Sequence, residues 1–366
     1  MTFKSTEPPK YNIDMSQDKY DSRYDRLMNI LYYAKELPTD LYTQMNLTHD
    51  NYRKAISILN QRGLIKKITK DGTIGHVLSL KAKQNTSYIL EYMKYRDCVD
   101  DISDRHQDIK RRSRKRQFAY LYALFDRVGI PYETFDKPPI SNKSICDNKV
   151  YFYTALDLKR MLGIEATTFI GSRLMGFLIG KRKIISVYRV NRQFITLGKH
   201  EALIPELLMR YFTGKINTAV MICSDDEAAV DITDQIIHHE SDDPRFGVNT
   251  AHYKCFYVFP SDDSFLSHFE DLYADYTAKE QRLIEQYGID TSDQDRYGRY
   301  RYKSGTGFLE NHPVLVCAGN VNAVKLKYFV RHTVSNNKES CIICNRRDAE
   351  TLKALTECTP VTVITV

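Results

Sequence analysis

A helix that runs directly into a β-hairpin constrains the fold of this chain more than any other feature. Apolar side chains recur at helical spacing in residues 51–62, at Tyr52, Ala55, Ile56 and Leu59. Gly63 follows, at the position where glycine commonly ends a helix. Two apolar runs, 64–69 and 76–80, then flank an Asp-Gly turn, which predicts a hairpin.

Two further helices are expected before this one. Residues 22–35 place Leu27, Ile30, Leu31 and Ala34 on one face, and Pro38-Thr39-Asp40 supplies a break and a cap before a short helix at 41–45. Thr48 can cap the third helix. Three helices and a basic hairpin indicate a winged helix-turn-helix over residues 22–83. The string 53–67 resembles the passage from recognition helix to wing in bacterial winged-helix regulators.

This arrangement predicts binding of double-stranded DNA. The third helix would enter the major groove, with Asn51, Arg53 and Lys54 near base edges or phosphates. The wing would hold the backbone through Lys66, Lys67 and Lys70. The alternative is a winged helix that serves as a protein-interaction platform, and the surrounding positive charge favours DNA.

A long basic helical connector is expected over residues 84–130, since 87–128 contain no Pro or Gly. Six of the seven residues from 110 to 116 are cationic: Lys110, Arg111, Arg112, Arg114, Lys115 and Arg116. They could bind phosphates beside the winged helix. The alternative, left open, is a solvated helix face on which upstream Asp residues pair with these cations.

A linker is expected over residues 131–150, because of its prolines, and an α/β domain with a mixed or largely parallel sheet over 151–366. Apolar runs and helical patterns alternate there. The expected strands are 174–179, 183–190, 193–197, 219–222, 255–259, 314–316, 341–343 and 361–366. The expected helices are 156–162, 203–212, 228–237, 265–286, 321–332 and 349–355. The fold class is therefore a multidomain α/β.

Carboxylates at strand ends are the best candidates for catalysis in this region. Asp225 and Asp226 follow one strand, and Asp262 and Asp263 follow the next. They could hold a divalent metal, but an N-cap role is the favoured interpretation. A polar loop is favoured over a metal site for His238-His239-Glu240 with Asp242-Asp243. Core packing is favoured for Cys341 and Cys344. No catalytic residue and no metal ligand is therefore assigned.

Motifs for nucleotide and hydrolase chemistry are missing from the sequence. There is no Gly-x-x-x-x-Gly-Lys loop, no Gly-x-Gly-x-x-Gly and no Gly-x-Ser-x-Gly, so no cofactor is expected. The first residues lack the apolar core of a signal peptide, and no stretch approaches the ~18 apolar residues of a membrane span. We expect a cytoplasmic protein with reduced cysteines and no membrane partner.

Positive charge is concentrated in the first part of the chain. Residues 1–150 hold 27 Lys and Arg against 19 Asp and Glu, whereas residues 215–366 hold 16 against 23. The first part is therefore the expected face for a polyanion. Within the acidic part, Arg296–Lys303 alternates cations with tyrosines, which could bind single-stranded DNA or form a surface hairpin.

The layout resembles the replication-relaxation type proteins of Firmicutes plasmids and integrative elements. The resemblance covers about residues 22–210 and includes 152–159, 172–178, 185–188 and Glu201. It implies a sequence-specific DNA-binding protein of a mobile genetic element, acting in replication initiation, transfer or transcription regulation, and we expect a homodimer. It also implies a second domain like a restriction endonuclease. The usual Pro-Asp and Asp/Glu-x-Lys pattern of the active nucleases is missing here, so the resemblance does not imply DNA cleavage. The alternative function is a metal-dependent nuclease or nicking enzyme that uses the strand-end carboxylates.

Overall fold

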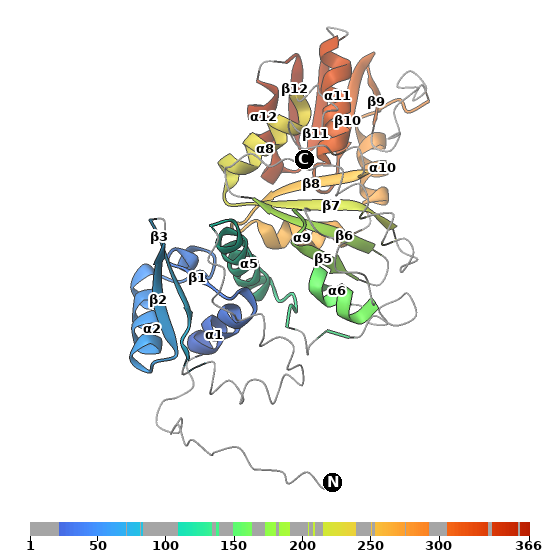
Figure 1. The fold of residues 1–366 in the computed structure, drawn as a ribbon. Coiled ribbons are helices and arrows are strands. Elements are labelled where there is room, and N and C mark those ends of the chain that lie inside the picture. The colour runs from blue at the N-terminus through green and yellow to red at the C-terminus, as the bar shows by residue number, and fades with distance from the viewer. Residues whose placement is uncertain are drawn as a thin grey trace. The chain divides into compact units, whose positions relative to one another are not determined.

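The computed structural model describes parts of both units of the chain. The described residues are 22–70, 72–80, 82, 109–133, 137–138, 149–162, 173–180, 183–190, 204, 208, 215–238, 250, 253–274, 276–292, 306–335, 339–357 and 359–366. The chain divides into the compact units Met1–Ala119 and Tyr120–Val366. Helices and mixed sheets make it a mixed α/β protein, as expected (Figure 1).

The first unit combines helices with a small antiparallel sheet. Its elements are α1 (Ser22–Ala34), β1 (Leu37–Pro38), the 3-10 helix η1 (Leu41–Thr43), α2 (His49–Gln61), β2 (Ile65–Lys70), β3 (Thr73–Leu78) and the first part of α5 (Ile109–Val128). The three strands lie in the order β1-β3-β2. The predicted inward stripe of α1 is confirmed, since Leu27, Ile30, Leu31 and Ala34 are all buried. The part of the predicted helical connector that precedes residue 109 lies outside the described part of the chain.

Local signals define α2 well. The Thr48 side chain accepts a hydrogen bond from the Asn51 amide at 3.3 Å, and Gly63 has a φ of 69°, so the predicted cap and the glycine end are confirmed. The helix begins at His49, two residues before the predicted start. Asp40 differs from expectation, because its side chain does not cap η1. Its carboxylate instead lies 3.7 Å from the Arg116 guanidinium.

A buried ion pair joins α5 to the rest of the first unit. Glu36 is 1% exposed and Arg112 is 5% exposed. The Arg112 guanidinium donates to both carboxylate oxygens of Glu36, at 2.7 and 3.1 Å. It also donates to the carbonyl oxygens of Lys70 and Thr73, at 3.2 and 3.4 Å. Arg112 therefore fixes α5 to the turn between β2 and β3.

The second unit contains a five-stranded sheet. Its strands are β4 (Tyr151–Thr154), β5 (Gly176–Ile179), β6 (Lys183–Val190), β7 (Lys215–Cys223) and β8 (Cys255–Pro260), in that order (Figure 1). β4, β5 and β6 pair antiparallel, whereas β6, β7 and β8 pair parallel. β4 was not predicted. The strand predicted at 193–197 and most of the helix predicted at 203–212 lie outside the described residues.

A second, four-stranded sheet follows, where the sequence suggested only one. It consists of β9 (Thr306–Leu309), β10 (His312–Cys317), β11 (Ser340–Cys344) and β12 (Val361–Thr365). The order is β12-β11-β10-β9, with only β9 antiparallel. The prediction of a single mixed sheet is therefore wrong, because helices pack between the two groups of strands. α8 (Asp226–His238) places Ile232 in the core of the first sheet and Ile237 in the core of the second.

The remaining helices of the second unit surround these sheets. They are α6 (Ala155–Leu162), α9 (Phe265–Tyr273), α10 (Thr277–Gln286), α11 (Ala323–Ser335) and α12 (Arg346–Thr356). The single helix predicted at 265–286 is wrong, since Ala274 adopts an extended ψ of 150° and ends α9. α11 and α12 pack on one face of the four-stranded sheet, and Leu283 of α10 packs on the other.

Parts of the predicted linker pack into the second unit. Tyr132 stacks on Tyr122 of α5, with ring centroids 4.6 Å apart. Lys137 is buried and donates to the Asp157 carboxylate at 2.7 Å. Burial lowers the pKa of Lys137, while Asp157 opposes that shift. Tyr132 and Lys137, which the sequence assigned to a linker, are therefore buried in this unit.

The described cysteines are free thiols, as predicted. Cys223, Cys317, Cys341 and Cys344 are buried, and Cys255 is half-buried. Burial raises the pKa of Cys223 and of Cys344 to about 12. Cys344 and Cys341 belong to two different apolar cores on β11, which confirms the predicted core packing. No helix in the described ranges has the length and apolar character needed to span a membrane.

Arg112→Met is expected to lower the free energy of unfolding of the first unit by about 3–5 kcal/mol, because it leaves the buried Glu36 carboxylate unpaired. Hydrogen exchange of α1 and β3 amides in the full chain would measure this locally. Arg114→Met is the control, since it removes the same charge from an exposed position of the same helix. Equal loss of protection in the two variants would contradict the assigned role of the pair.

Candidate nucleic-acid interface

The outer face of α2 presents polar side chains because its inner face is fixed. Tyr52, Ala55 and Leu59 are buried, and the Tyr52 hydroxyl donates to the Pro38 carbonyl oxygen at 2.6 Å. Two of the predicted contact residues, Arg53 and Lys54, are exposed, and Asn51 is half-buried. The structure adds three exposed polar residues that the sequence analysis did not assign: Ser57, Asn60 and Gln61. Helical periodicity from the buried stripe could have identified them.

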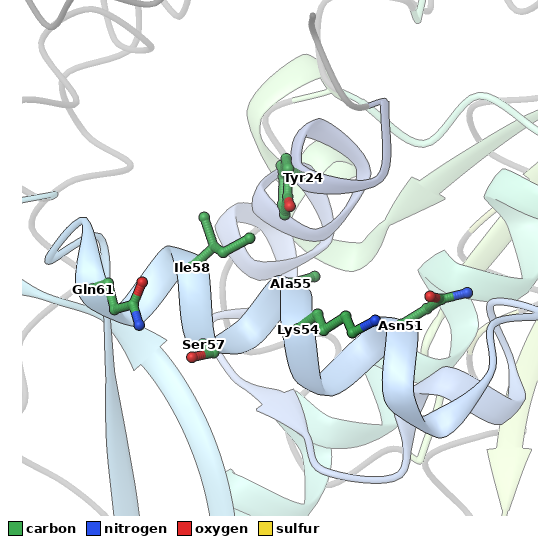
Figure 2. Close-up of a pocket in the computed structure, with 7 residues that line it drawn as sticks. All are labelled: Tyr24, Asn51, Lys54, Ala55, Ser57, Ile58 and Gln61. Carbon is green, nitrogen blue, oxygen red and sulfur yellow. The ribbon is translucent and has the colours of Figure 1, made fainter. Parts of the chain in front are cut away.

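A hollow of about 350 Å³ lies along one side of this face. Its lining residues come from α1 and α2: Tyr24, Asn51, Lys54, Ala55, Ser57, Ile58 and Gln61. Figure 2 shows Ile58 directed toward Tyr24, Lys54 extended toward Asn51, and Ser57 and Gln61 farther along the helix. An apolar floor is thus bordered by side chains that can donate or accept hydrogen bonds.

The hairpin formed by β2 and β3 carries the predicted wing cations. Lys66 and Lys67 are both exposed on β2, and Lys70 is half-buried at its end. Because neighbouring residues of a strand point to opposite faces, Lys66 and Lys67 cannot both face one ligand surface. Lys67 pairs in register with His76. Burial, followed by the positive charge of Lys67, lowers the pKa of His76, so this histidine favours its neutral form.

The basic run of α5 divides into internal and surface residues. The prediction that Arg112 binds DNA is wrong, because its guanidinium is buried and pairs with the Glu36 carboxylate inside the first unit. Arg116 donates to the Ile74 carbonyl oxygen at 3.0 Å. Arg114 is exposed, with its guanidinium 5.8 Å from the Phe118 ring centroid, and Lys115 is half-buried. The side chains of Lys110 and Arg111 lie outside the described residues. At most part of this run is therefore available to phosphates.

The strand-end carboxylates form turns and caps. Asp225 accepts a hydrogen bond from the Ala228 amide at 2.8 Å, which confirms it as a cap of α8. Asp262 accepts from the amide and hydroxyl of Ser264, at 2.8 and 2.6 Å, in the turn that precedes α9. His238 is exposed, 3.4 Å from Asp234. In the described ranges no three His, Cys, Asp or Glu side chains lie close enough to hold one metal ion.

Comparison with known proteins gives no match: no protein-family model, no curated protein and no solved structure matches the chain. The family resemblance drawn from the sequence therefore stays a prediction.

Thr48→Ala is expected to destabilise α2 by about 1 kcal/mol, because the Asn51 amide loses its capping partner. Hydrogen exchange of the first-turn amides would show the loss. Thr48→Ser retains the capping oxygen and is the matched control. Unchanged exchange in the alanine variant would exclude a capping role.

Proposed function

We propose that the first unit is a winged helix-turn-helix that binds double-stranded DNA, with α2 as the recognition helix and β2–β3 as the wing. The observation that carries the proposal is the outer face of α2. Arg53 and Lys54 are exposed there, while the opposite face is held by Tyr52, Ala55 and Leu59. An α-helix with a fixed inner face and a basic outer face matches the width and charge of the major groove.

The uncharged polar side chains of α2, together with Lys54, contact the base edges. Asn and Gln can pair with adenine through two hydrogen bonds, and Lys can donate to guanine. Asn51, Lys54 and Gln61 line one continuous hollow with Ala55 and Ile58. Its apolar floor suits the methyl group of thymine. These residues supply the sequence-specific part of the interaction.

Arg53 and the cations of the wing bind the phosphates. Lys66 and Lys67 point to opposite faces of β2, so only one of them meets a given DNA backbone, and Lys70 lies at the turn. Arg114 and Lys115 of α5 add positive charge to the first unit for phosphate binding. Arg112 does not, because its charge is paired with Glu36. Counterion release by these cations would make the affinity depend strongly on salt.

The family resemblance noted in the sequence supports a proposal for the biological role of this DNA binding. We place this DNA binding in replication initiation, transfer or transcription regulation of a mobile genetic element. The second unit would serve dimerisation or partner binding. A homodimer would pair two recognition helices with two half-sites about one helical turn apart.

Replacing Arg53, Lys54 and Lys67 by alanine should weaken duplex binding and reduce its salt dependence by about one unit of slope for each phosphate that is no longer neutralised. The measurement is fluorescence anisotropy, over a range of salt concentrations, with duplexes enriched by the protein from a random-sequence pool.

The control for this variant is alanine at Arg282, Arg346 and Lys353, three exposed cations of the second unit. It changes the net charge by the same amount and should leave both the affinity and the slope unchanged. If the two triple variants lost affinity equally, general charge would explain the binding and the proposed interface would be wrong.

Gln61→Ala should relax selection at one base position, with a loss of about 1–3 kcal/mol in discrimination. Lys67→Ala should instead weaken all duplexes alike. Repeating the random-pool enrichment with each variant separates the two effects. An unchanged preference in the Gln61 variant would remove this residue from the reading set.

A further inference from the structure

The outer edge of β12 differs from the other sheet edges of the second unit. β12 lies at one end of the four-stranded sheet (Figure 1). At the opposite end, Asp290 exchanges two backbone hydrogen bonds with Phe308 of β9, at 2.8 and 2.9 Å. In the five-stranded sheet, the Phe152 amide of β4 donates to the Pro131 carbonyl oxygen at 2.9 Å, and Asn322 Oδ1 accepts from an amide of β8 at 3.2 Å. Among the described residues, no group bonds to the outer edge of β12.

The hydrogen bonds to β11 show which backbone groups of β12 face outward. The Pro360 carbonyl oxygen accepts from the Ser340 amide at 3.0 Å, and the Val366 amide donates to the Cys344 carbonyl oxygen at 2.9 Å. Backbone groups of successive residues point to alternate sides of a strand, so the even-numbered residues of this segment bond to β11. Outward N–H and C=O groups therefore belong to Val361, Val363 and Thr365.

β12 lacks the features that usually keep an exposed edge from pairing. Such edges commonly carry lysines, an internal proline or a bulge. The outer edge of β2 in the first unit follows this rule, since Lys66 and Lys67 are exposed there. β12 contains no charged residue and no proline, and its register with β11 is continuous from Val361 to Thr365. Its outer edge is therefore open to a further strand.

A second copy of β12 matches this edge in one antiparallel register. Two identical edges related by a two-fold axis perpendicular to the sheet run antiparallel, and opposed side chains lie on the same face. An axis at Val363 places the two copies of this residue opposite each other, and Val361 of each copy opposite Thr365 of the other. All the outward N–H and C=O groups are then paired. Every other symmetric register leaves some of them without partners.

This register also covers apolar side chains. Val361 and Val363 pack against the core on one face of the sheet, and Ile364 packs against the core on the other face. All three are half-buried, so part of their surface is still in contact with water. Thr362 of each copy would lie opposite Ile364 of the other. Cross-strand pairs of this kind stabilise antiparallel strands.

Charges near β12 do not oppose a second copy. α12 packs against β12 and carries four exposed charges, two of each sign: Arg346, Lys353, Glu350 and Glu357. Glu350 and Lys353 already pair with each other at 2.9 Å. Because the signs balance, two copies of this face bring no excess of like charge together.

We propose that the outer edge of β12 is the interface of a homodimer, in which the two four-stranded sheets join into one continuous sheet. A second copy is the occupant because the outward backbone groups and the uncharged side chains of β12 are complementary to themselves. The contact uses both edges, so it closes at two copies. The proposal goes beyond DNA binding and does not depend on it, and it supplies an interface for the homodimer of the proposed function.

Thr365→Pro tests the interface. Proline removes the outward N–H of an exposed residue and leaves the bonds to β11 in place. Sedimentation equilibrium of the DNA-free full chain should show a dimer, and Thr365→Pro should raise its dissociation constant about tenfold or more. Thr365→Val is the matched control, because it retains the N–H and the branched shape, and it should leave the constant unchanged.

A chain that stays monomeric at every concentration would overturn the proposal in favour of a strand from another protein. Equal dissociation constants for Thr365→Pro and Thr365→Val would also overturn it, since the dimer would then form elsewhere. Duplex binding is measured separately on the same samples. A dimer that does not bind duplex DNA would contradict the proposed function and leave this interface intact.

Charge at Val363 tests the register. Val363→Lys and Val363→Glu each set like charges opposite each other at the axis, so each variant alone should dimerise about tenfold more weakly or worse. An equimolar mixture of the two should dimerise again, because opposite charges then meet. If the mixture dimerises no better than either variant alone, the register is wrong and the proposal fails. Circular dichroism checks that both variants fold, and if they do not, the Thr365 variants decide.

Discussion

The buried carboxylate of Glu36 is the constraint on which the first unit depends. An ionised carboxylate with no partner is very costly inside a protein, so its burial requires a cation with good geometry. Arg112 provides that cation from a distant part of the sequence and also satisfies the carbonyl oxygens of Lys70 and Thr73. Gly75 is part of the same arrangement, because a Cβ there would lie 2.4 Å from Glu36 Oε1. The hairpin, the loop after α1 and the first part of α5 are therefore positioned together.

Features of the first unit that depend on neighbours in sequence could be predicted, and those that depend on distant partners could not. The stripe from Leu27 to Ala34, the Thr48 cap and the end of α2 at Gly63 follow from periodicity and local hydrogen bonding. In the basic run, by contrast, Arg112 and Arg114 look alike in sequence. Only the fold shows that Arg112 lies inside and Arg114 outside. Of the predicted interface, the exposed cations of α2 are available to a ligand, whereas the run on α5 is available only in part.

The same distinction applies to the second unit. Apolar runs predicted β7, β8, β10, β11 and β12, but alternation of strands and helices does not show which strands are neighbours. The split into two sheets was therefore missed. β9 was missed because it is only four residues long and contains Gly307, a residue that is depleted in strands. The fold requires a glycine there, because a Cβ at residue 307 would lie 2.7 Å from the Asp290 carbonyl oxygen. The break at Ala274 has no Pro or Gly to mark it.

The two units differ in how their cationic side chains are used. α2 and β2 present donors, Arg53, Lys54 and Lys67, which suit an anion. At the strand ends of the second unit, by contrast, cations are bound within the fold: Arg347 donates to Asp271 and Asn320, and Arg127 donates to the Asp262 carbonyl oxygen. The exposed cations of the first unit are therefore available to a ligand, whereas these arginines of the second unit stabilise its own turns and helix ends.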